Sequence, residues 1–138
     1  MKKCLIATVA VFIVWMAGGF VIHGMLLHDD YAQVANLFRP EAEAKQYCWL
    51  MLVAQAIMAS AFVWIYKQGV EDKPWLQQGL RYGLAIALLT TVPLYTMYFV
   101  IQPVPGALVV KQIIGDSIFN LIVGAIVAFI YRPRPQSA

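Results

Sequence analysis

Four apolar segments, each about long enough to cross a lipid bilayer, constrain this chain more than any other feature. A spanning helix needs roughly 20 mostly apolar residues. In lipid only helices and closed barrels satisfy their own backbone, so each segment is predicted to be helical. The predicted spans cover approximately residues 4–27, 47–66, 82–101 and 108–131. We therefore predict an all-α membrane protein, with residues 1–138 forming a single domain of four transmembrane helices in an antiparallel bundle.

The composition agrees with this class. Hydrophobic residues make up 62% of the 138 residues and charged residues 12%, whereas a soluble domain is about 45–50% apolar and about 25% charged. The first apolar segment follows Met1-Lys2-Lys3 and in this resembles a signal peptide. It is longer than the apolar region of about 7–15 residues that such peptides carry. We interpret it as an uncleaved first span.

The basic residues predict the orientation, because Lys and Arg concentrate in cytoplasmic loops. One side of the predicted spans carries Lys2, Lys3, Lys67, Lys73, Arg81, Arg132 and Arg134. The other side carries only Arg39, Lys45 and Lys111. Both termini are therefore predicted to be cytoplasmic, in a multi-pass protein of the cell membrane, such as a bacterial inner membrane. The net charge of +3 follows from this topology, so no nucleic-acid partner is expected.

The first outer connection, residues 28–46, carries helix signals. Asp29 or Asp30 is suited to cap a short helix that reaches about Phe38. Its apolar face would carry Tyr31, Val34, Ala35 and Phe38. Such a helix can lie on the membrane surface, and an ordinary ordered loop is the alternative. Pro40 suits the first turn of a further helix that runs straight into the second span.

Asp116 is the one carboxylate that lies well inside an apolar span. A charged side chain in hydrocarbon is costly, so it faces the protein interior, a partner or water. Gln112 and Asn120 lie one helical turn before and after it, on the same face. Two readings remain open for Asp116: a structural pair with Lys111 or His23, or a functional group.

Each of the four spans places a hydrogen-bonding side chain in the outer half of the membrane, given a helical rise of about 1.5 Å per residue. The candidate residues for binding a ligand or a proton are His23, Gln55, Tyr95, Tyr98, Asp116 and Asn120. If their faces converge, the bundle has a polar core near its outer mouth. The alternative is that they hold the helices together, because interhelical hydrogen bonds do so in membranes.

No motif for covalent catalysis, phosphate binding or dinucleotide binding is present. His23, His28, Asp29 and Asp30 suggest a metal site, but two histidines five residues apart do not align on a helix. We therefore predict no metal site and can name no cofactor, and an enzymatic role has little support. Pro93 can kink the third span and free backbone carbonyls beside the polar layer.

Several short features together resemble small four-helix bacterial membrane proteins that remain uncharacterised. They are the Gly-Gly-Phe stretch and the histidine of Gly18–His23, Tyr31, Arg39-Pro40 and the acidic residue of the fourth span. The resemblance covers most of the chain. It implies the four-helix fold and no activity.

The sequence favours a non-catalytic accessory or assembly subunit of a larger membrane complex, because the chain is small and carries no catalytic motif. Its partners would be the lipid bilayer and other membrane-protein subunits, or further copies of the chain. The alternative is binding or transport of a proton, an ion, a quinone or another small amphiphile through the outer polar layer. No comparable polar path continues to the cytoplasmic side, so a blind pocket is favoured over a channel.

Overall fold

The computed structural model describes residues 2–132, and these form helices and connections without a strand. The order of the elements is α1 (Lys2–Gly19), η1 (Phe20–Leu26), α2 (His28–Ala32), η2 (Ala35–Leu37), α3 (Glu41–Ala44), η3 (Lys45–Tyr47), α4 (Cys48–Gln68), α5 (Trp75–Ile86), η4 (Ala87–Thr91), α6 (Val92–Ile101) and α7 (Gly106–Tyr131). η1 and η4 are π-helical, whereas η2 and η3 are 3-10 turns.

Four continuous helices are long and apolar enough to cross a membrane: Lys2–Leu26, Glu41–Gln68, Trp75–Ile101 and Gly106–Tyr131. The prediction of four helices that are long and apolar enough to span a membrane is thereby confirmed. The third begins at Trp75 rather than near residue 82, because Pro74 lies at its N-cap and Gln78 and Arg81 interrupt the apolar run without ending the helix. The second begins directly after Pro40, as predicted.

The first connection differs from the predicted single helix that ends near Phe38. It forms two short pieces, α2 and η2, because the Val34 N–H donates to the Tyr31 carbonyl in a tight turn. Leu27, not an aspartate, occupies the N-cap of α2. Val34 is only 6% exposed and belongs to a small core with Ile22 and Leu108. The segment therefore folds onto the ends of the long helices.

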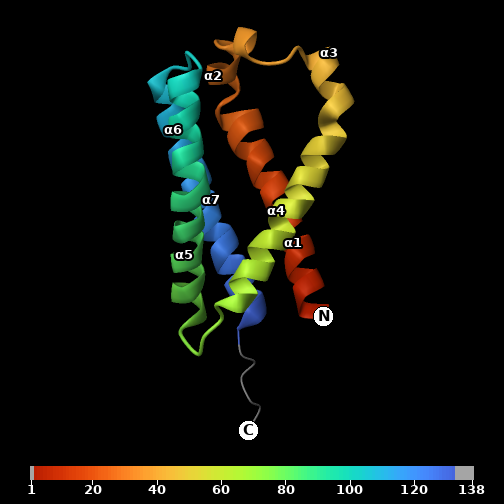
Figure 1. The fold of residues 1–138 in the computed structure, drawn as a ribbon, viewed down its shortest axis with the longest axis vertical. Coiled ribbons are helices and arrows are strands. Elements are labelled where there is room, and N and C mark those ends of the chain that lie inside the picture. The colour runs from red at the N-terminus through yellow and green to blue at the C-terminus, as the bar shows by residue number, and fades with distance from the viewer. Residues whose placement is uncertain (1, 133–138) are drawn as a thin grey trace.

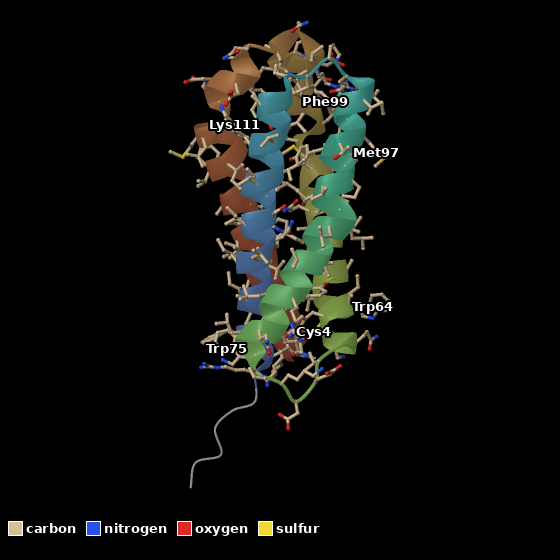
Figure 2. The ribbon with its side chains drawn as sticks, turned by 90° about the vertical axis from the view of Figure 1, so that its left-hand side faces the viewer. Cys4, Trp64, Trp75, Met97, Phe99 and Lys111 are labelled. Carbon is tan, nitrogen blue, oxygen red and sulfur yellow. The ribbon has the colours of Figure 1, made fainter. Side chains whose placement is uncertain are left out.

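Consecutive long helices run in opposite directions, and α1 begins at the end of the molecule where α7 finishes (Figure 1). We call this the terminal end, and we call the opposite end, which carries α2 and the turn at residues 102–105, the loop end. α7 packs against α5 and α6 on one side and α1 on the other, while α4 packs mainly on α1. Figure 2 shows Trp64 and Trp75 near the terminal end, the level at which tryptophans meet a membrane surface.

The contact between α5 and α7 depends on glycine. A Cβ added to Gly79 would lie 2.6 Å from the Ala128 Cβ, and one added to Gly83 would lie 2.8 Å from the Leu121 Cα. A Cβ on Gly124 would lie 2.9 Å from the Gly83 nitrogen. Small residues allow such close backbone approach between membrane helices. The two backbones therefore approach each other closely at these glycines.

Among residues 2–132, the hydrogen bonds between α4 and α5 lie near the terminal end. The Tyr82 hydroxyl donates to the Phe62 carbonyl at 2.6 Å, and the Tyr66 hydroxyl donates to Gln78 Oε1 at 3.2 Å. The rings of Phe62 and Tyr82 also pack with their centroids 4.6 Å apart. Toward the loop end α4 diverges from α6 (Figure 1). The separation between α4 and the α5–α6 segment therefore increases from the terminal end to the loop end.

Two π-helical segments lie inside spans one and three. η4 comes just before Pro93. Proline has no N–H to donate to the carbonyl of Leu89, four residues earlier. The predicted disturbance of the third span by Pro93 therefore takes the form of a wider, π-helical turn. η1 contains His23 and was not predicted from the sequence. Such turns are rare and occur often at functional sites.

We expect Gly83→Ala to lower the free energy of unfolding by about 1–3 kcal/mol, because overpacking a tight contact costs that much. Gly19→Ala is the matched control, since a Cβ there meets nothing within 4 Å. Denaturant titration in mixed micelles measures both variants. Equal stability of the two would show that α5 and α7 do not touch through Gly83.

Candidate functional site

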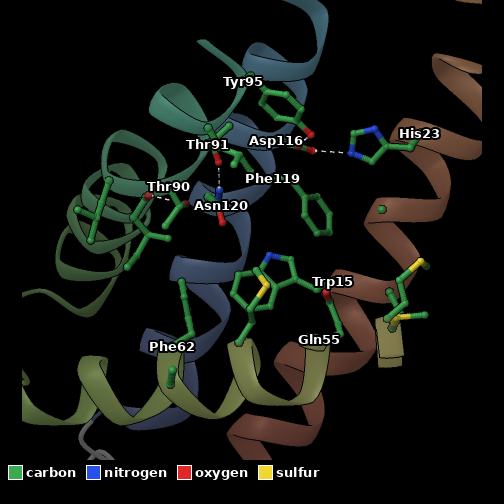
Figure 3. A pocket seen from close by; sticks show the side chains of 18 of the residues that line it. Trp15, His23, Gln55, Phe62, Thr90, Thr91, Tyr95, Asp116, Phe119 and Asn120 are labelled. Carbon is green, nitrogen blue, oxygen red and sulfur yellow. Dashed lines mark hydrogen bonds and ion pairs between the residues drawn. The ribbon is translucent and has the colours of Figure 1, made fainter. Parts of the chain in front are cut away.

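Asp116 lies where three helices meet. On α7, its Oδ2 accepts a hydrogen bond from the Tyr95 hydroxyl of α6 at 2.6 Å. Its Oδ1 lies 3.2 Å from Nε2 of His23 on η1 (Figure 3). The Asp116 side chain is 22% exposed. Three of the predicted site residues are thus in direct contact, and the carboxylate is still open to a ligand.

A chain of hydrogen bonds links His23 to the loop end. His23 Nδ1 lies 2.8 Å from the Tyr31 hydroxyl, which accepts a hydrogen bond from Gln112 Nε2, also at 2.8 Å. Burial raises the pKa of the Tyr31 phenol, so this group keeps its proton. With the Tyr31 hydroxyl donating to Nδ1, Nε2–H donates to Asp116. Asp116 then accepts two hydrogen bonds, one from His23 and one from Tyr95.

Lys111 does not pair with Asp116. Its Nζ lies 2.8 Å from both carboxylate oxygens of Asp30, which ties α7 to α2. Of the two partners considered for Asp116, the structure places His23 beside it. The positive charge of Lys111 is therefore paired with Asp30 at the loop end and not with Asp116.

A second polar contact lies one turn closer to the terminal end. Asn120 Nδ2 donates to Thr91 Oγ1 at 2.9 Å, and each residue is 7% exposed. Thr91 was not among the candidate residues, although it lies one helical turn before Tyr95 on the same face. Asn120 and Asp116 therefore contact two successive turns of the η4–α6 segment, at Thr91 and Tyr95.

These groups line one part of a cavity of about 700 Å³. Its polar lining comprises His23, Gln55, Thr90, Thr91, Tyr95, Asp116 and Asn120. The remaining wall is almost entirely apolar and includes Trp15, Met16, Phe20, Met51, Met58, Phe62, Leu89, Leu94 and Phe119. Gln55 contributes from α4, opposite α7 (Figure 3). Tyr98 lies outside the cavity lining and is 45% exposed.

The cavity is closed toward the terminal end and open at its side. Trp15 and Phe62 pack edge to face with centroids 4.9 Å apart, next to a packed core that includes Val63. Met51 on α4 and Leu89 on η4 line the cavity and are 66% and 72% exposed. In a membrane this side faces lipid. A molecule can therefore enter between α4 and the η4–α6 segment without crossing water.

No family model, curated protein or solved structure matches this chain.

Replacing Tyr31 by Phe removes the hydroxyl that joins Gln112 to His23. We expect the free energy of unfolding to fall by about 1–3 kcal/mol, because partly buried polar partners lose their hydrogen bonds. Tyr98→Phe, at an exposed tyrosine outside the cavity, should change it by no more than about 0.5 kcal/mol. Chemical denaturation in micelles compares the two. Similar effects at both positions would show that the series of hydrogen bonds from Gln112 through Tyr31 and His23 to Asp116 contributes nothing to stability.

Proposed function

We propose that this protein binds a small amphiphile that enters its cavity from the membrane. The observation that carries the proposal is the cavity itself. It has a volume of about 700 Å³, apolar walls and a few converging polar groups. Ligand sites for small molecules have this character and volumes of about 300–1,000 Å³. The cavity opens at its side, within the membrane-spanning region. The ligand is therefore expected to be a molecule that is dissolved in lipid.

The walls suggest how such a ligand would lie. Its apolar body would contact the methionines and aromatic rings of α1 and α4. Its polar head would reach Asp116, which Tyr95 and His23 hold in place. Transfer of an ion across the whole membrane has less support, because a packed and largely apolar core lies between the cavity and the terminal end.

For the orientation, we propose that the terminal end is cytoplasmic in an antiparallel four-helix bundle of the cell membrane. The basic residues around the terminal end support this, because positive charge marks cytoplasmic loops. The cavity, with Asp116 and His23, would then lie in the outer half of the membrane.

The accessory-subunit role stays a prediction. Exposed apolar side chains cover the outer faces of the long helices. Such faces suit lipid and partner helices equally well, because helices associate in membranes through packing and not through hydrophobicity. The cavity is the more specific feature, so ligand binding has the stronger support.

The orientation can be tested by thiol labelling in a background with Cys4 and Cys48 replaced by Ser. Gln33→Cys at the loop end should react with a membrane-impermeant maleimide in intact host cells. Asp72→Cys, between α4 and α5, should react only after permeabilisation. The reverse pattern would show that the termini face outward.

Binding can be tested by filling the cavity at Gly19, which lines it and has open space where a Cβ would lie. We expect native mass spectrometry to detect small-molecule adducts on the wild type that Gly19→Phe lacks. Val100→Phe, at a position that is 80% exposed and outside the cavity lining, is the control and should keep them. Identical adducts on all three would contradict binding in the cavity.

A further inference from the structure

We infer that the amphiphile carries a positively charged head, so that the ligand is a lipophilic cation. This inference rests on the proposed function and adds the charge of the ligand. It follows from the groups that face the cavity. Asp116 carries the one carboxylate of the lining, and no lysine or arginine among residues 2–132 lines it. Lys111, the nearest basic residue along α7, is paired with Asp30.

The hydrogen-bonding capacity left at Asp116 favours a cation or a donor. The Tyr95 hydroxyl donates to Asp116, the Thr90 hydroxyl to the Ile86 carbonyl and the Asn120 amide to Thr91. His23 faces Asp116 with Nε2. An ionised carboxylate offers about four acceptor positions, and these contacts use two of them. About two acceptor positions of Asp116 therefore remain for a ligand.

These free acceptor positions separate ligand classes. A quinone presents carbonyl oxygens, with which an ionised carboxylate, an acceptor only, makes no hydrogen bond. An anionic head would lie against Asp116 in a medium of low dielectric constant without a lysine or arginine to offset the repulsion. An ammonium or phosphonium head would be attracted to the carboxylate, as opposite charges are when water is excluded.

Aromatic rings line the same space. Trp15, Phe20, Phe62, Tyr95 and Phe119 all contribute to the cavity wall. The negative face of an aromatic ring attracts cations, most strongly for tryptophan, and the attraction grows when the cation is desolvated. The walls thus offer a cation both apolar contact and electrostatic attraction.

Three methionines, Met16, Met51 and Met58, also belong to the lining. Methionine is flexible and polarisable, and it suits binding surfaces that accept ligands of different shape. We therefore expect charge and size to select the ligand more strongly than the outline of its apolar body.

The test uses three probes: tetraphenylphosphonium, tetraphenylborate, which has the same shape and the opposite charge, and the smaller neutral triphenylmethanol. Equilibrium dialysis against the full-length protein in lipid nanodiscs, with empty nanodiscs as the blank, measures the binding of each. We expect saturable tetraphenylphosphonium binding that is lost in Gly19→Phe. Asp116→Asn should weaken it by about tenfold or more, whereas Asp116→Glu should retain most of it, because only the former removes the charge.

Other outcomes separate the two proposals. If triphenylmethanol binds in a way that Gly19→Phe abolishes, but tetraphenylphosphonium binds no better and is insensitive to Asp116→Asn, the cavity is a ligand site and the cation inference is wrong. The same holds if tetraphenylborate binds as well as the cation. If Gly19→Phe alters the binding of none of the three probes, the cation inference is overturned and the proposed function loses its support. Thermal unfolding of each variant confirms that lost binding is not lost folding.

Discussion

The close approach of α5 and α7 at Gly79, Gly83 and Gly124 determines where the polar groups of this protein lie. Lipid gives membrane helices no hydrophobic reason to associate, so close packing and interhelical hydrogen bonds hold them together. Asn120 lies one turn before Gly124 and Asp116 one turn earlier still. Along this seam each reaches a partner, Thr91 for Asn120 and Tyr95 for Asp116. Glycine packing thus brings a carboxylate and its hydrogen-bond partners into register between the helices.

The cavity exists because α4 follows a different path from the helices around it. Hydrogen bonds and aromatic packing join α4 to α5 at Phe62 and Tyr66, and the two helices diverge from there. The divergence leaves an apolar wall of α4 facing the polar seam of α7 (Figure 3). An amphipathic space that is closed toward the terminal end and open to lipid follows from this geometry.

The sequence predicted the four helices and much of the polar site, because apolar length and the four-residue spacing are local signals. Depth and helical face placed His23, Tyr95 and Asp116 in one polar layer, whereas their convergence was left open. Tyr98 was included with them, yet residues three apart differ by about 60° around a helix, enough to leave it outside the cavity. Gly79 was missed because the predicted span began at residue 82. The Lys111–Asp30 pair and the divergence of α4 depend on contacts distant in the chain, which no local pattern reports.

A crystal structure of the protein grown from a lipid phase, with no ligand added, would test ligand binding in the cavity most directly. We expect density inside the cavity for a molecule whose body lies between α4 and α6 and whose polar end is next to Asp116. Its head should lie within contact distance of the carboxylate, with Tyr95 and His23 still bonded to it. A structure in which α4 packs against α6, leaving no space beside Asp116, would contradict the proposal.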